Sequence, residues 1–109
     1  MFDLIVIIRV PDPAGIPAVA DALTRMRPLC LAEEGCVAWE AYQSHDDPGR
    51  FVLVERWETR EVWELHGDGE AIQKIYVPEI MPRIEREVHS SRPLRPVAGA
   101  DAVPNVAAG

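Results

Sequence analysis

The chain has 109 residues and carries 11 lysines and arginines against 18 aspartates and glutamates, which gives a formal net charge of -7. A chain of this length is expected to form one domain that buries its own core without disulfides or structural metal. Nucleic acid is not expected as a partner, because binding its phosphates favours a continuous positive surface and the basic residues here are scattered.

An apolar run, Leu4–Ile8, lies near the N-terminus between Asp3 and Arg9. The run is too short to cross a membrane, and no basic segment of the kind found in signal peptides precedes it. We predict a central β-strand covered on both faces, no membrane partner and a cytoplasmic location. In that reducing compartment, Cys30 and Cys36 are expected to be small buried hydrophobic residues rather than a disulfide or a metal pair.

A helix is predicted from Ile16, where apolar residues begin to recur at helical spacing after a proline-rich break. Its buried stripe is expected to contain Val19, Leu23, Met26 and Cys30. Pro28 falls inside this pattern and predicts a kink or an early end near Arg27, because proline removes a helical hydrogen bond. Gly35 is expected to close the helix in the left-handed conformation.

The sequence pattern of residues 36–57 predicts two strands joined by one turn. The first covers about 36–43, and the second starts at Arg50 or Phe51. Between them, the segment 46–49 reads Asp-Asp-Pro-Gly, and proline followed by glycine is the order that a type II turn prefers.

Both faces of this hairpin are apolar. Because alternate residues of a strand point to opposite sides, one face carries Phe51, Leu53 and Trp57, and the other carries Val52 and Val54. The chain's own helices can cover one face, but the second face needs another cover. A second copy of the same chain is the economical source, so we expect a homodimer.

The next segment predicts two short helices at an angle. Thr59 can cap a first helix that ends at His66, where Gly-Asp-Gly at 67–69 interrupts the pattern. A second helix is expected to carry Ile72, Ile75 and Tyr76. Two prolines, Pro78 and Pro82, are expected to bound one further turn.

Glu85–Ser91 predicts a fourth strand with Val88 facing inward. The order strand, helix, strand, strand, helix, strand is that of a ferredoxin-like fold. We therefore predict an α+β domain over residues 1–91, with an antiparallel sheet and the helices on one face. The segment 92–109 is rich in proline and alanine, and it is expected to be either a disordered tail or an arm along the partner subunit.

Several motifs are shared with a known family: Glu-Gly-Cys at 34–36, Asp-Asp-Pro at 46–48, the segment 50–58, and His66 nine residues after Trp57. On these residues the sequence resembles the antibiotic biosynthesis monooxygenase (ABM) domain, a small dimeric α+β barrel. That superfamily includes cofactor-independent oxygenases of polyketide anthrones and quinols, haem-degrading enzymes, an isomerase of a signalling sugar, and proteins with no known activity.

The resemblance implies that Trp57 lines a pocket, as a tryptophan at the end of the third strand does in the polyketide oxygenases. Leu53 stands where those enzymes have an assisting asparagine. In the haem-degrading members an asparagine, a tryptophan and a histidine correspond to Ile8, His66 and Tyr76 here. The axial histidine is therefore missing, and neither haem nor any other cofactor is expected.

Cofactor-free oxygenation needs a base, a dry pocket and a stabiliser for the oxyanion, because the substrate itself supplies the electrons. His66 is the best candidate base, since histidine titrates near neutrality; otherwise it is a helix-end histidine that bonds a free carbonyl. Trp57 is expected to shape the pocket, or else to be an ordinary core tryptophan. Tyr76 is expected to donate a hydrogen bond to a substrate oxygen, or else to a backbone partner.

The predicted substrate-binding residues are Leu53, Glu55 and Trp63. Glu55 shares a strand face with Trp57, and a carboxyl group among apolar pocket walls would have a raised pKa. An ion pair of Glu55 with Arg9 or Arg83 is the preferred interpretation. Trp63 either packs in the core or forms a second pocket wall.

Three functions remain open. The leading hypothesis is a cofactor-independent monooxygenase that uses O2 to oxidise an aromatic, quinol-like or polyketide-derived small molecule, because no nucleotide or flavin motif is present. The second is an isomerase or cyclase on the same scaffold, with His66 as acid and base. The third is a non-catalytic module that binds an apolar ligand or only dimerises. No metal is expected, since adjacent residues such as His45 and Asp46 rarely converge on one ion.

Overall fold

The computed structural model describes residues 1–95, so most of the expected tail, 92–109, lies outside the described residues. The elements in chain order are β1 (Phe2–Arg9), η1 (Pro13–Gly15), α1 (Ile16–Leu31), β2 (Cys36–Gln43), β3 (Arg50–Trp57), α2 (Arg60–His66), η2 (Ala71–Ile80), η3 (Met81–Arg83) and β4 (Glu85–Ser91). This is the α+β, ferredoxin-like order predicted from the sequence, and that prediction is confirmed.

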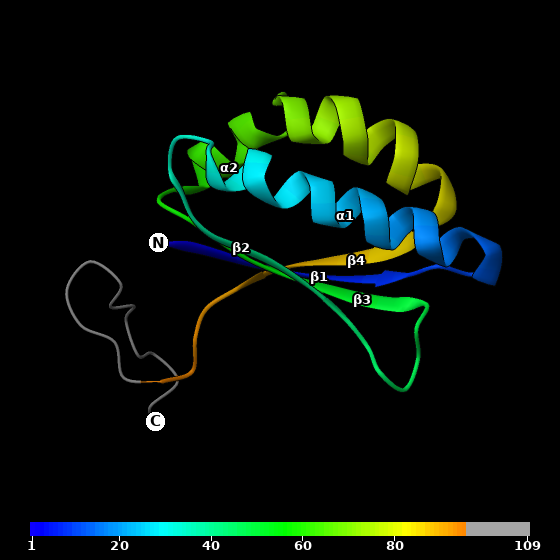
Figure 1. Cartoon of the computed structure of the whole chain (residues 1–109). Coiled ribbons are helices and arrows are strands. Elements are labelled where there is room, and N and C mark those ends of the chain that lie inside the picture. Colours follow the sequence, from blue (N-terminus) through cyan, green and yellow to red (C-terminus); the bar gives the residue numbers. More distant parts are fainter. Residues whose placement is uncertain (96–109) are drawn as a thin grey trace.

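The four strands form one antiparallel sheet in the order β2-β3-β1-β4. β1 is central, as its apolar run predicts, and it pairs with β3 on one side and β4 on the other. Figure 1 shows the helices together on one face of this sheet. No helix within residues 1–95 has the length and apolar character needed to cross a membrane.

The two faces of the sheet differ in burial. On the helix-facing side, residues such as Val6, Ile8 and Leu53 are at most 3% exposed. On the opposite side Ile5 is 37% exposed and Val54 is 43% exposed. The expectation that the first strand is covered on both faces therefore holds for one face only, within the described part of this single chain.

α1 buries the predicted stripe of apolar residues and does not end near Arg27, which was one of the two outcomes predicted for Pro28. The helix continues through Pro28 to Leu31. Pro28 is exposed and Cys30, two residues later, is fully buried. Packing of that last turn therefore keeps the segment helical, although the proline supplies no N–H to the helix.

Gly35 closes the α1–β2 connection in the left-handed region, with φ of +83°, as predicted. A Cβ atom at this position would also collide with the side chain of Val62 on α2. Glycine is therefore required twice, once by the backbone conformation and once by the close approach of α2.

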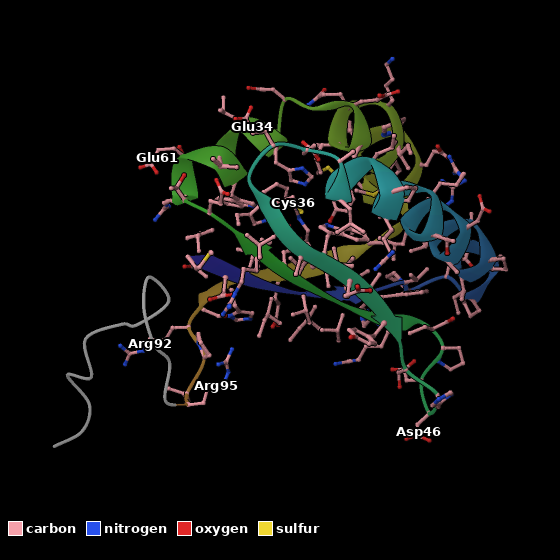
Figure 2. The ribbon with its side chains drawn as sticks, turned by 60° about the vertical axis from the view of Figure 1, so that its left-hand side comes forward. Glu34, Cys36, Asp46, Glu61, Arg92 and Arg95 are labelled. Carbon is pink, nitrogen blue, oxygen red and sulfur yellow. The ribbon has the colours of Figure 1, made fainter. Side chains whose placement is uncertain are left out.

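The β2–β3 turn differs from the prediction. It spans Asp47–Arg50, closed by the Arg50 N–H donating to the Asp47 carbonyl at 2.9 Å. Gly49 does not have the positive φ that a type II turn requires, so that assignment is wrong. Its carbonyl instead accepts the Val10 N–H at 2.8 Å, which ties the turn to the end of β1. Asp46 marks the tip of this hairpin, away from the helices (Figure 2).

The second predicted helix is present as η2, but it is a π-helix rather than an α-helix. The Met81 N–H donates to the Tyr76 carbonyl, five residues earlier. Pro78 lies inside η2 instead of bounding a separate turn, and because proline donates no hydrogen bond it interrupts a regular α-helical ladder there. β4 follows with the predicted bounds, and Val88 lies opposite Val6 on the helix-facing side.

Candidate active site

A pocket of about 420 Å³ lies between the helix-facing side of the sheet and the segments α2 and η2. This volume falls within the range of small-molecule sites. Most of its wall is apolar, formed by residues such as Leu4, Val6, Trp39 and Ile72. Among the lining residues, Met81 and Val88 are 42% and 43% exposed, so the pocket reaches solvent beside β4.

His66 lines the pocket and is only 5% exposed. Its Nδ1 lies 2.7 Å from Oε2 of Glu33, which is in the turn after α1. The partner of this helix-end histidine is thus a carboxylate, not a free carbonyl. A carboxylate on Nδ1 favours the tautomer in which Nδ1 carries the proton and Nε2 has a free lone pair.

Gly69 allows Glu33 to reach His66. A Cβ atom at position 69 would lie 2.7 Å from Oε1 of Glu33, which is closer than real Cβ contacts allow. The glycine therefore provides the space that the carboxylate occupies. Gly69 therefore has a structural role beside the pocket. From the sequence, we predicted only that the 67–69 segment interrupts the helix.

Trp57 is fully buried and does not line the pocket. Its ring lies against the ring of His66, with centroids 4.5 Å apart and planes tilted by 39°. Its Nε1–H donates to Oε1 of Glu55 at 3.0 Å. Trp57 therefore packs behind the pocket wall and holds His66 and Glu55 in place. It is not positioned to contact a molecule bound in the pocket.

Glu55 lines the pocket and is 5% exposed. The pKa of its carboxyl group is raised to about 7, mainly by burial; the Trp57 hydrogen bond and the charge of Arg86 lower it, and the negative charge of Glu33 adds to the rise. The preferred ion pair with Arg9 or Arg83 is wrong. Arg9 bonds Glu85 at 3.0 Å, and Arg83 donates to the Glu79 carbonyl at 2.7 Å.

Tyr76 lines the pocket from η2 and is 4% exposed. Its hydroxyl oxygen accepts a hydrogen bond from Nη1 of Arg86 at 3.1 Å, and the guanidinium lies 5.4 Å from the centre of the tyrosine ring. Burial raises the pKa of the phenol, and the charge of Arg86 opposes the shift. The tyrosine hydroxyl keeps its own proton free to donate into the pocket.

The remaining predicted residues, Leu53 and Trp63, also line the pocket. Leu53 is 3% exposed and provides an apolar wall. Trp63 packs against Phe2, with ring centroids 5.3 Å apart, and so acts both as a pocket wall and as part of the packing around β1.

Five of the six predicted site residues therefore surround one pocket, and Trp57 lies behind it. Sequence reasoning missed Glu33, Trp39 and Arg86. Both Trp39 and Arg86 had a weak signal in the sequence: alternation along β2 puts Trp39 on the inward face, and Arg86 lies two residues before Val88, which was predicted to face inward. Glu33 had none, because its contact with His66 joins residues 33 positions apart.

The other two histidines lie elsewhere. His45 is exposed on the hairpin turn. His89 is exposed on β4, where its Nε2 lies 3.2 Å from a carboxylate oxygen of Glu87, a partner that the sequence did not suggest. Cys30 and Cys36 are both free, and Cys30 is fully buried near Glu33 and His66.

Comparisons with known proteins agree with this architecture. A solved antibiotic biosynthesis monooxygenase superposes with a TM-score of 0.78 at 23% identity, covering 87% of this chain and 100% of that protein. A conserved protein of unknown function from Bacteroides thetaiotaomicron gives 0.75 at 24% identity, over 83% and 94% of the two chains. PA3566 from Pseudomonas aeruginosa gives 0.76 at 17% identity, over 86% and 95%.

These identities are low, so the likeness to solved structures establishes the fold alone. No curated protein matches the chain. The family model described as antibiotic biosynthesis monooxygenase matches residues 1–76, which is more than half of the sequence and includes β1 to β3, α2 and His66. The chain therefore belongs to the antibiotic biosynthesis monooxygenase family.

Proposed function

We propose that the protein is a cofactor-independent monooxygenase that oxidises an electron-rich aromatic molecule, quinol-like or polyketide-derived, with O2. The observation that carries the proposal is the Glu33–His66 pair, which holds a buried imidazole at the wall of a mostly apolar pocket. Family membership supports an oxygenase, and the substrate class follows from the apolar, aromatic walls.

His66 is the proposed base. With the Nδ1 proton donated to Glu33, the lone pair on Nε2 can accept a proton from a phenol or from an acidic carbon next to a carbonyl group. Glu33 would then stabilise the imidazolium that forms, because its carboxylate lies 2.7 Å from Nδ1. Trp57 fixes the plane of the imidazole ring by packing against it.

Arg86 and Tyr76 are the proposed stabilisers of the substrate anion. Arg86 brings a permanent positive charge to the pocket, and Tyr76 offers a hydroxyl donor polarised by its bond from that guanidinium. Glu55, with a pKa of about 7, is largely protonated in mildly acidic solution and then adds no negative charge to oppose the anion.

The electrons for the reaction come from the substrate. The anion passes one electron to O2, and the substrate radical and superoxide combine to form a peroxide anion, which takes back the proton held by His66 and becomes a hydroperoxide. Loss of water from that hydroperoxide converts a CH2 group into a carbonyl, so one oxygen atom enters the product and the other leaves as water. A pocket with apolar walls suits this sequence, because water is kept away from the anion.

Oxygen consumption tests the proposal directly. The protein is treated with chelator, shown to lack flavin by its absorbance spectrum, and mixed with a panel of anthrones and hydroquinones in an oxygen electrode. We expect uptake above the buffer rate and one labelled atom in the product from 18O2. Buffer-level uptake across the whole panel would contradict the proposal.

An isomerase or cyclase is the second candidate, because a carboxylate-supported histidine is an acid–base group that needs no oxygen. The same panel incubated under argon separates the two. Product formed at an unchanged rate without oxygen would assign the Glu33–His66 pair to proton transfer alone.

We also propose a homodimer formed through the outer face of the sheet. On this face Ile5 lies opposite Val54 and Ile7 lies opposite Val52, so four apolar side chains form a contiguous group on β1 and β3. Ile5 and Val54 are 37% and 43% exposed in the single chain. Burying such a group against a second copy is favourable by about 25 cal/mol for each Å² removed from water.

Sedimentation equilibrium tests the dimer. We expect the wild type at twice the chain mass and a Val54→Lys variant at the single-chain mass, because the substitution places a charge in the proposed interface. Leu65→Lys is the matched control, since Leu65 is 70% exposed on α2, and α2 lies with the other helices on the opposite side of the sheet (Figure 1). A folded wild-type monomer would exclude the proposed dimer.

A further inference from the structure

Three potential metal ligands meet beside the pocket. Sγ of Cys30, a carboxylate oxygen of Glu33 and a ring nitrogen of His66 all lie within 4.8 Å of one another. They come from the last turn of α1, the turn that follows it, and the last residue of α2. We propose that these three residues bind a zinc ion, with a fourth position left to water or another small ligand.

The donor set points to zinc. A thiolate, an imidazole and a carboxylate are the three kinds of protein ligand that Zn²⁺ takes, and three protein ligands with one open position is a common arrangement at its catalytic sites. Magnesium and calcium prefer oxygen donors alone, so a sulfur and a nitrogen ligand disfavour them.

The distances require a small adjustment. Ligand atoms around tetrahedral Zn²⁺ lie roughly 3.5 Å apart, given bond lengths of about 2.0 to 2.3 Å. The 2.7 Å contact between Glu33 and His66 would have to open, while Cys30 Sγ would have to come closer. Glu33 can supply most of this movement, because its side chain is 23% exposed and the neighbouring Gly69 has no side chain to crowd it.

Burial and charge favour a cation at this point. Cys30 is fully buried and His66 is 5% exposed, so water competes weakly for their donor atoms. The negative charges of Glu33 and Glu55 favour a cation beside the Cys30 thiol; burial raises the pKa of that thiol, so the ion must displace a firmly held proton. A bound Zn²⁺ replaces the thiol proton, so each ion bound releases one proton from Cys30 to solvent.

The zinc site shares His66 with the proposed oxygenase but does not depend on that function. Zinc on either ring nitrogen removes the free base form of the imidazole, so the two roles exclude each other at any one moment. The oxygen-uptake test uses chelated protein and the zinc test reads an optical spectrum. Failure of one therefore leaves the other intact.

Cobalt substitution tests the site, because Co²⁺ takes zinc positions and is coloured. The reduced full-length protein is titrated with Co²⁺ and then with Zn²⁺. We expect a sulfur-to-cobalt charge-transfer band that saturates at one ion per chain, the release of one proton per ion, and loss of the band as Zn²⁺ displaces Co²⁺. A wild-type protein that shows no such band would overturn the proposal.

Matched variants locate the ligands. Cys30→Ser should abolish the band, whereas Cys36→Ser should keep it. The reverse pattern would refute the site.

Glu33→Gln should weaken Co²⁺ binding by about tenfold or more. This variant keeps the proposal testable should Cys30→Ser fail to fold. Its control is Glu34→Gln, since Glu34 is exposed and lies on the outside of the molecule (Figure 2). Equal loss in both glutamate variants would contradict a role for Glu33.

Discussion

Two regions under the same helical layer have different interiors. In the packed region, Val19 and Leu23 of α1 lie in one apolar cluster with Ile8 and Phe51 of the sheet, and none of the four is more than 3% exposed. In the pocket region, beneath α2 and η2, the sheet meets a cavity into which Glu55 and His66 bring polar groups. One sheet thus supports a filled core and a pocket within a single small domain.

The packed region contributes mainly to stability, and the pocket region mainly to function. Close packing of apolar side chains stabilises the packed region. The pocket region contributes less, because a cavity forgoes those contacts and buried polar groups cost free energy unless they are paired. The polar groups there are paired with one another, as Glu33 with His66 and Trp57 with Glu55. Changes in the pocket region should therefore affect chemistry more than folding.

The largest expected effect is on turnover. We predict that His66→Gln lowers the rate of the proposed oxidation by about 100-fold or more, the usual contribution of a general base. Glutamine can still donate to Glu33, so the fold should remain. The rate is measured by oxygen uptake and the stability by urea unfolding. His89→Gln, an exposed histidine outside the pocket, is the control, and equal rates in the two variants would remove His66 from the mechanism.

The opposite pattern is expected in the packed region. Leu23→Ala should lower the free energy of unfolding by about 3 kcal/mol, since it leaves a void in a filled core. Leu31→Ala, at the 36% exposed end of α1, should cost less than about 1 kcal/mol. Urea unfolding at a fixed protein concentration measures both. Equal losses would mean that the interior beneath α1 is not filled as described.

The packed region and the strands could be predicted from sequence because periodicity reports burial. Apolar spacing along α1 and alternation along β3 gave the correct faces, and the left-handed Gly35 was marked by its place after a helix. Where local patterns compete with tertiary contacts the prediction failed. α1 continues past Pro28 because Cys30 beyond it is buried, and Gly49 bonds to β1 rather than adopting a type II turn.

The pocket could be predicted only in part. Residues on one strand face, such as Leu53 and Glu55, follow from alternation, and both line the pocket. The partners that give these groups their chemistry come from elsewhere in the chain. Glu33 reaches His66 from a turn, and Arg86 reaches Tyr76 from the edge strand. Such pairings depend on how elements meet in space, which periodicity does not encode.

A smaller, pH-dependent effect is expected at Glu55. Its carboxyl pKa is 4.5 in the unfolded chain and about 7 when folded, so the folded state binds the extra proton between these values. The stabilisation is present below pH 4.5 and is lost as the pH rises through 7, in total about 3 kcal/mol at most.

We predict that Glu55→Gln flattens this fall in stability. Urea unfolding at several pH values between 4 and 8 measures the slope for each protein. The exposed Glu58 provides the control, and Glu58→Gln should keep the wild-type slope. A slope unchanged by Glu55→Gln would show that folding does not raise the pKa of this carboxyl group.

The smallest expected effect concerns Gly69, which links the pocket region to the turn after α1. In Gly69→Ala the new Cβ would lie 2.7 Å from Oε1 of Glu33, so the carboxylate must move and its bond to His66 must lengthen. The moving group is the end of a flexible side chain, so the unfolding free energy should change by less than about 1 kcal/mol. Turnover should fall about tenfold, the cost of a lost orienting bond.

Gly15→Ala, whose Cβ would make only ordinary contacts, is the control. A Gly69→Ala enzyme as fast as that control would mean that Glu33 need not hold His66 for catalysis.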